Sequence, residues 1–519
     1  MFFMSTGWLQ GARRFGRALG CAALVFLLDF HSVDCFAERI NQEGRILGPA
    51  PVVTNAVLFN TPQADAILSA MQILPVTNAW NEDISRRPLL ANSDAMISQI
   101  IADLASSRRT LRAFEEMNFV LVPDSQPALP IAFVDYPDES DPSPYPIPPN
   151  MPVEGWPSQV TNTLSGWQQD PYNIGGDRHA IIVAPGAGFT WEMWQAKLTN
   201  GNWEASNGAK FDLKSNNLRP AGWTSGDAAG LSMFPALPRY DECERGMVEH
   251  ACRIVVKRSR KEYIYPATHW ASTTAVSQVN VPAMGQRLRL KSSFVIPASW
   301  AEEEKAILLA LKKYGAIVAD NGGFFSISVT PDDRWPANAF SHLASIGITN
   351  FEVIQTTGAS GGPRSPGAPA ASAGPDRIAA PSVPMSLQGY VSFTGVAPLI
   401  NWKLYSGPGT VSFSNASVTN STATFSTAGT YTLMLSADDS VHAVAYDAVV
   451  INVTTGITLT GKPSGQNLTL TWTGGSPPYT IESATSLTAV SWSTLLTTNS
   501  LIAQIPMAAP NAYFRIRSQ

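Results

Sequence analysis

Apolar residues occur along most of the chain in short runs separated by Gly, Pro, Asn and Ser, a pattern typical of β-strands and turns. In the N-terminal two thirds, the runs predict strands at 179–184, 190–195, 251–257, 262–265, 287–293, 316–319 and 324–329. Residues 320–323 read as a hairpin turn between the last two. Helical spacing occurs at 93–117 and at 299–314, where Ser299 and Glu302 fit a capping box. We therefore expect a mainly β fold, with a large β-rich N-terminal domain that carries a few helices.

The second half divides at a segment of unusual composition. In residues 357–382, 21 of 26 residues are Gly, Ala, Ser or Pro, which predicts a flexible linker whose two sides orient independently. Short strands follow it at the spacing of a β-sandwich. The expected organisation is a body at 38–355, a linker at 356–383, and small β-sandwich modules at 384–455 and 456–519.

Several motifs in these modules are similar to known families. The runs SGPGTVSF (406–413), ATF (423–425), AGTY (428–431) and LSADD (435–439) resemble a PKD-type immunoglobulin-like module of secreted bacterial proteins. That resemblance implies that Trp402 and Tyr431 lie in the core. Residues 456–519 resemble a small fibronectin type III-like module. Both resemblances imply spacing, surface attachment or weak glycan contact.

The body has a resemblance of its own. It carries GDRH (176–179), RPAGWTS (219–225), AAGL (228–231) and YGAIVADNG (314–322). These motifs resemble an uncharacterised family of secreted bacterial proteins over residues 78–353. The resemblance implies no established activity.

The N-terminus has the features of an export signal. Arg13, Arg14 and Arg17 precede an apolar run at 18–28, and cleavage near Ala37 removes residues 1–37. We therefore expect a secreted protein at the cell surface or outside the cell, with the periplasm as the alternative. The arginine pair leaves twin-arginine export open. Only 14% of residues are charged and the net charge is -5, which argues against nucleic-acid binding.

Removal of the signal leaves two cysteines, Cys243 and Cys252. In an oxidising compartment two cysteines usually pair, and the residues between them resemble a turn. We predict a disulfide across a hairpin, with two free buried thiols as the alternative.

The strong motifs of several enzyme classes are missing. The sequence has no phosphate-binding loop, no Gly triplet for dinucleotides, no HExxH and no GxSxG. Their absence argues against nucleotide enzymes, HExxH metalloproteases and serine hydrolases of the α/β type.

Scattered polar residues in an aromatic setting are the best candidates for chemistry. Arg178 and His179 stand at the mouth of an apolar strand. In the next strand, alternation places Glu192 and Trp194 on one face and Trp191 on the other, and a carboxyl beside the Trp194 indole suits a general acid. The alternative is a half-buried glutamate paired with Arg178.

A long loop at 216–231 supplies a second acid, Asp227, which could instead cap the following turn. His250 is a candidate base or metal ligand, with a structural histidine as the alternative. Residues 135–141 contain four acids, so the loop is a candidate for Ca²⁺, and otherwise a solvated loop.

These observations favour a secreted glycan hydrolase or polysaccharide lyase. The expected catalytic residues are Glu192, Asp227, His179 and His250. The expected substrate-binding residues are Arg178, Trp191, Trp194, Trp223, Tyr265 and His269. A His/carboxylate metal site is the other chemical use of this set. The alternative function is a non-catalytic glycan-binding or adhesion protein, which predicts no convergent pocket of acids and histidines.

Overall fold

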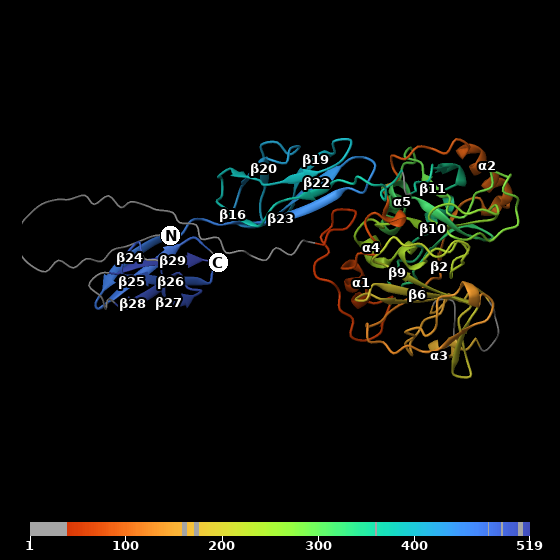
Figure 1. Cartoon of the computed structure of the whole chain (residues 1–519), viewed down its shortest axis with the longest axis horizontal. Helices are drawn as coiled ribbons and strands as arrows, with labels where there is room; N and C mark the ends of the chain where they lie inside the picture. The colour runs from red at the N-terminus through yellow and green to blue at the C-terminus, as the bar shows by residue number, and fades with distance from the viewer. Residues whose placement is uncertain are drawn as a thin grey trace, which may run out of the picture.

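The computed structural model describes residues 39–157, 163–170, 176–358, 361–475, 477–488, 491–506 and 512–518. The expected signal at 1–37 lies outside these ranges. The expectation of a mainly β fold is confirmed, since strands far outnumber helices in the described residues. Figure 1 shows a large domain, which we define as residues 39–355, followed by two smaller β modules.

A six-stranded sheet forms the centre of the large domain. Its strands, in spatial order, are β14 (Phe351–Val353), β11 (Arg287–Leu290), β12 (Ala316–Asn321), β10 (Cys252–Val256), β13 (Phe325–Val329) and β2 (Leu111–Glu115). Because β10 lies between β12 and β13, residues 320–323 do not form the expected hairpin. The predicted strand at 262–265 is reduced to one bridge between Tyr263 and Met284. β2 lies at one edge of the sheet and β14 at the other.

A second sheet packs against the first. Its order is β1 (Val57–Leu58), β3 (Val120–Leu121), β5 (Ala180–Ala184), β6 (Phe189–Trp194) and β9 (Asn207–Asp212). β5 is buried along its whole length because its alternate residues enter two cores. Ile181 and Val183 join the main core, and Ala180 and Ile182 join a smaller one. The small sheet of β4 (Ile131–Phe133), β8 (Asn202–Ala205) and β7 (Lys197–Thr199) covers the smaller core.

Few helices accompany these sheets. The described ones are α1 (Pro62–Ser69), α2 (Ser93–Asp103), α3 (Leu164–Gln168), α4 (Tyr240–Glu244) and α5 (Glu302–Lys313). The predicted helix at 93–117 was too long, because its second half becomes β2, which pairs with β13. The predicted helix at 299–314 is confirmed as α5, but its N-cap is Ala301. The Glu304 carboxylate accepts the Ala301 N–H at 3.3 Å, so the expected Ser299 box is wrong.

The predicted disulfide is absent. Cys243 and Cys252 are both buried free thiols in the described part of the chain. Cys243 lies in α4 and Cys252 begins β10, so the two residues do not face each other across a hairpin. Burial raises the pKa of both thiols, which keeps them in the unreactive protonated form.

The first module begins earlier than its composition indicates. β15 (Ala370–Ser372) pairs with β18 (Tyr390–Ser392), and β16 (Arg377–Ala379) pairs with β23 (Ala445–Val453). Much of the segment expected to be a flexible linker is therefore part of a sheet. The rest of the module is β22 (Gly429–Asp438), β19 (Leu399–Ser406), β17 (Met385–Ser386), β21 (Thr422–Phe425) and β20 (Val411–Phe413). Trp402 and Tyr431 lie in its core as expected.

The second module is a pair of three-stranded sheets around a core of its own. One sheet holds β24 (Thr458–Ser464), β25 (Asn467–Thr473) and β28 (Ile502–Pro506); the other holds β27 (Ser493–Thr498), β26 (Tyr479–Ala484) and β29 (Tyr513–Ser518). Among the described helices, none combines the length and the apolar character that a membrane crossing needs.

Candidate functional site

The loop at 219–234 is fixed by a buried ion pair. Asp227 is 0% exposed and receives two hydrogen bonds from Arg253, from Nη2 at 2.9 Å and from Nε at 3.0 Å. Arg253 projects from β10 and also donates to Ser328 Oγ at 2.8 Å. A bidentate pair of this kind is strong where water is excluded. Asp227 therefore anchors the loop to the central sheet.

His179 holds the same loop from the other sheet. Its Nδ1 lies 2.8 Å from Glu154 Oε2, and its Nε2 lies 2.8 Å from the carbonyl oxygen of Gly226. Both neighbours are hydrogen-bond acceptors, so both ring nitrogens carry protons. Burial opposes that charge, but the Glu154 carboxylate outweighs burial and raises the pKa of His179 to about 9. His179 is thus an imidazolium at neutral pH rather than a base.

Glu192 holds the last part of the loop. Its carboxylate is 0% exposed and accepts from Ser232 Oγ at 2.6 Å, from Met233 N at 2.8 Å and from Phe234 N at 3.1 Å. Burial raises the pKa of Glu192 to about 7, against the lowering effect of these three donors. Three of the four predicted catalytic residues therefore converge on one loop, where each is buried and bonded to protein groups. Catalysis by them stays a prediction.

His250 lies in a different cluster. Its Nε2 is 3.2 Å from Glu242 Oε2 and its Nδ1 is 2.8 Å from the carbonyl oxygen of Ala251. Arg239 lies 2.8 Å from Glu242 on the other side. Burial opposes the charge of Glu242, but Arg239 and His250 lower its pKa to about 2. The structure does not bring His250 together with the other three residues.

The predicted substrate-binding residues are dispersed. Arg178 is 5% exposed and donates to the carbonyl oxygens of Ala196 and Trp167, so it does not pair with Glu192. Each of the others has a contact within the protein: Trp191 with Phe189, Trp194 with Asp177, Trp223 with Arg219, Tyr265 with Arg364, and His269 with the carbonyl of Ala228. They form no single aromatic platform.

Two further acids reach the same ion pair and were missed in the sequence. Glu116 accepts from Ser328 Oγ at 2.8 Å, and Asp320 lies 3.6 Å from Arg253 Nη2. Burial, and then the nearby Glu154, raises the pKa of Glu116 to about 7. Burial, and then Asp227, raises the pKa of Asp320 to about 6. Glu116 was hidden because it fell inside the predicted helix at 93–117.

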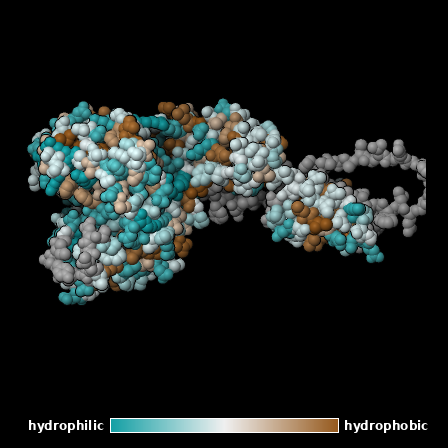
Figure 2. Space-filling view, turned by 180° about the vertical axis from the view of Figure 1, so that it is seen from behind, coloured by the Kyte–Doolittle hydropathy of each residue, from teal (hydrophilic) through white to brown (hydrophobic). Residues whose placement is uncertain are grey.

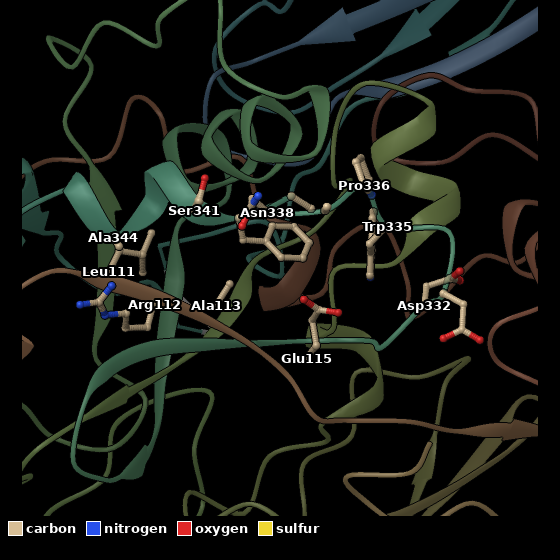
Figure 3. Close-up of a pocket in the computed structure, with 14 residues that line it drawn as sticks. Leu111, Arg112, Ala113, Glu115, Asp332, Trp335, Pro336, Asn338, Ser341 and Ala344 are labelled. Carbon is tan, nitrogen blue, oxygen red and sulfur yellow. The ribbon is translucent and has the colours of Figure 1, made fainter. Parts of the chain in front are cut away.

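A cavity of about 580 Å³ lies at the edge of the sheet formed by β2. We call it the β2 cavity and define it by Arg112 and Glu115 on the strand and by Trp335, Asn338, Phe340 and Ser341 on the opposite wall. In Figure 3, Glu115 projects from the strand toward the wall that carries Asn338 and Trp335. Burial raises the pKa of Glu115 above the ordinary value. A volume between about 300 and 1,000 Å³ is usual for small-molecule sites.

The far wall of the β2 cavity is held in place by aromatic and ionic contacts. The Trp335 ring lies 5.1 Å from Tyr240 and 5.2 Å from Phe340, and its Nε1 donates to the carbonyl of Thr330 at 3.0 Å. Arg334 lies 4.0 Å over the Tyr240 ring and pairs with Asp332. These contacts fix the positions of the wall residues in the absence of ligand.

The acidic loop at 135–141 uses its carboxylates within the protein. Asp141 accepts from Lys210 N at 2.7 Å and from Arg219 Nη1 at 2.5 Å, and Glu139 accepts from Thr224 N at 2.8 Å. Across the described ranges, no group of three or more His, Cys, Asp or Glu side chains could hold a metal ion.

No family model matches the chain, and no curated protein matches it. Among solved structures, the chain is similar to "the PKD domain from KIAA 1837 protein", with 25% identity and a TM-score of 0.15 over 21% of this chain and 100% of that one. It is similar to the D00-D0 domain of intimin, with 17% identity and a TM-score of 0.18 over 29% and 86% of the two chains. DIP-gamma IG1+IG2 matches with 11% identity and a TM-score of 0.15 over 27% and 84%.

These neighbours are PKD and immunoglobulin-like domains, the class expected for the modules. With TM-scores this low, the β-sandwich architecture rests on the strand pairing of the modules themselves. The resemblance of the large domain to an uncharacterised secreted family stays a prediction.

Proposed function

We propose that this chain is a secreted modular protein whose large domain binds extracellular glycan in the β2 cavity. The observation that carries the proposal is the composition of that cavity. It combines a carboxyl, an amide and a hydroxyl, from Glu115, Asn338 and Ser341, with the aromatic rings of Trp335 and Phe340. Sugars present hydroxyl groups and apolar C–H faces, which such a mixture binds.

The edge position of β2 supports the same proposal. The Leu111 N–H donates to Ile346 O, away from β13, whereas the Glu116 N–H donates to Val329 O of β13. Since backbone groups alternate in direction along a strand, those of Ala113 face the same side as those of Leu111. A glycan hydroxyl in the cavity can therefore meet backbone as well as side-chain groups. The two modules would then space or attach this binding domain.

The test is retention on a panel of plant and microbial polysaccharides, followed by titration of a soluble fragment of the one that is retained. We expect Glu115→Gln combined with Asn338→Gly to weaken binding by about ten- to a hundredfold, the usual effect of losing a charged hydrogen bond. Asn338 has φ +67°, so glycine removes its side chain without straining the backbone.

Matched controls make this test specific. Asn200→Gly changes another exposed asparagine with positive φ (+51°), and Glu302→Gln changes a glutamate that is 76% exposed on α5. Both controls should bind as the wild type does. Retention of no polysaccharide, or full affinity in the double variant, would contradict the proposed site.

A second candidate function is cleavage of the glycan, by hydrolysis or by a lyase reaction. The shifted pKa values of Glu116 and Glu154 favour it. The pKa of Glu116 is raised to about 7. Burial opposes ionisation of Glu154, but His179 lowers its pKa overall. Neighbouring carboxyl groups with opposite shifts suit an acid and a base.

This second candidate predicts release of product from the retained polysaccharide. Glu116→Gln should lower the rate by about a hundredfold or more, the usual share of a general acid. Glu302→Gln should leave the rate unchanged. If the polysaccharide is retained but never cleaved, binding without catalysis is the function.

A further inference from the structure

The first module meets the large domain at three separate places, and a hairpin at 39–47 makes the first of these contacts. Figure 2 shows the first module against the large domain, with the second module beyond it. The Leu47 N–H donates to the Arg39 carbonyl at 2.7 Å, which closes the hairpin. The Ile46 N–H instead donates to the Tyr405 hydroxyl of the first module at 3.1 Å. One backbone group of the hairpin is therefore bonded to the module.

The hairpin itself is anchored on the large domain. Arg45 donates to both oxygens of the Glu249 carboxylate, from Nε at 3.0 Å and from Nη2 at 2.8 Å. Its Nη1 donates to the Ser69 carbonyl at 2.6 Å, and Glu43 pairs with Lys313 at 2.6 Å. A bidentate arginine–carboxylate pair fixes orientation as well as position. The hairpin is thus a fixed part of the large domain that reaches the first module.

The tip of the hairpin packs on an aromatic ring of the module. A β-carbon at Gly44 would lie 2.9 Å from the Tyr446 ring, so a side chain there would displace the ring. Burial, and then the nearby Glu43, raise the pKa of Tyr446 to about 12, which agrees with a ring covered by the hairpin. Gly48 has the same φ as Gly44, +71°, but a β-carbon at Gly48 would meet nothing within 4 Å.

The second contact is made by the turn that joins β22 to β23. Arg86 donates to Asp438 Oδ2 at 3.1 Å and to Ser440 Oγ at 2.8 Å. Arg87 donates to the Val441 carbonyl at 2.9 Å. Two neighbouring arginines of the large domain therefore hold both ends of this turn.

The third contact is the segment that connects the two domains. The Thr357 hydroxyl donates to Glu82 Oε2 at 2.8 Å. Glu82 is 4% exposed and also accepts from Arg87 Nε at 2.9 Å. Further along the segment, Arg364 lies 5.2 Å over the Tyr265 ring. The chain is thus tied to the large domain before it enters β15 of the module.

We propose that residues 39–453 move as one rigid body, in which the hairpin at 39–47 is the clasp that holds the first module in a fixed orientation. Domains of one chain usually move relative to each other unless their interface restrains them. A single contact would leave the module free to pivot about it, whereas contacts at three places oppose rotation. Any pivoting of the second module then occurs after β23 ends at Val453. The clasp does not depend on the glycan proposal.

Distances between spin labels on the full chain test the rigid body. Glu302→Cys places a label on α5, Ser412→Cys places one on the first module, and Thr497→Cys places one on the second module, all at exposed positions. The native thiols of Cys243 and Cys252 are buried, so they should stay unlabelled. We expect a narrow distance distribution between the first two labels. The distribution between the labels on the two modules should be at least about twofold wider.

Two glycine variants test the clasp. Gly44→Ala places a β-carbon against the Tyr446 ring, so it should widen the distribution between the large domain and the first module by at least about twofold. Gly48→Ala imposes the same backbone strain without that contact, so it should keep the distribution narrow. A wild-type distribution as wide as that between the two modules would overturn the rigid body. A narrow distribution in Gly44→Ala, or equal widening in both variants, would overturn the clasp.

The Ile46 amide provides a second measurement that needs no glycine variant. Its N–H donates to a hydroxyl of the module, so Tyr405→Phe should speed its hydrogen exchange by about tenfold. The Leu47 N–H, which is bonded within the hairpin, should stay protected. Tyr390→Phe changes a tyrosine of the same module that is 66% exposed, and it should leave exchange at Ile46 unchanged. Equal exchange at Ile46 in the wild type and in Tyr405→Phe would overturn the contact between hairpin and module.

Discussion

Replacing Arg253 with methionine should lower the free energy of unfolding of the large domain by about 3–5 kcal/mol, the usual effect of breaking a buried ion pair. The change leaves Asp227 as a carboxylate that is 0% exposed and has lost its bidentate partner. It also removes the donor that orients Ser328 toward Glu116. Urea unfolding followed by tryptophan fluorescence measures the effect, since ten of the 14 tryptophans lie in this domain.

A double variant separates loss of the pair from loss of packing. Arg253→Met combined with Asp227→Leu removes both charges, so it should be less destabilised than the sum of the two single variants. Arg108→Met, at an exposed arginine, should change stability by less than about 1 kcal/mol. If Arg253→Met unfolds at the wild-type urea concentration, the buried pair is not the anchor described here.

The stability of the large domain should fall as pH rises from about 5 to about 9. The pKa values of Glu192 and Glu116 are about 7 and that of Asp320 is about 6, so the folded chain keeps protons that the unfolded chain loses. These acids therefore favour the fold at low pH, and that benefit is lost as pH rises through their folded values. His179, with a pKa of about 9, contributes fully below the unfolded value of about 6.5 and loses its contribution through about 9. Melting temperatures across this range measure the trend.

Two other acids make the large domain less stable in more acidic solution. The pKa of Glu242 is lowered to about 2 and that of Glu154 is also lowered, so their stabilisation is complete above the ordinary glutamate pKa and is lost below it. Maximum stability is thus expected near pH 5. Glu192→Gln should remove on the order of 2–3 kcal/mol of the decline between about pH 5 and 8, because the amide does not titrate. Glu302→Gln should keep the wild-type slope, and a wild-type chain that is most stable near pH 8 would contradict the assignment.

Local pattern was enough to predict β5, β6, β10, β11, β12 and β13, the helix at α5 and the class of fold, because those elements follow runs of apolar residues. It failed at 93–117, where helical spacing continues into β2. The choice between helix and strand there is made by pairing with β13, more than 200 residues away. It also failed at 357–382, since small residues that cannot form a core alone still add strands to an existing sheet, as Ala370–Ser372 does with β18.

The candidate site was predicted only in part for a similar reason. His179, Glu192 and Asp227 were found as polar residues beside apolar strands, and they do converge on one loop. Their partners decide what they do, and Glu154 and Arg253 lie far from them in sequence. The presence of the charged residue Arg253 within the apolar strand β10 was the sequence feature that indicated a buried ion pair. The β2 cavity had no such sign, because its walls come from segments far apart in the chain.

We expect ligand to bind in the β2 cavity, while the predicted catalytic residues His179, Glu192 and Asp227 hold the loop at 219–234. The most direct measurement is hydrogen exchange of the wild-type chain with and without a soluble fragment of the polysaccharide it retains. We expect slower exchange at 111–116 and 332–344, the two walls of the cavity, and unchanged exchange at 219–234. Slower exchange confined to 219–234, or to the two modules, with the cavity walls unchanged, would contradict binding in the β2 cavity.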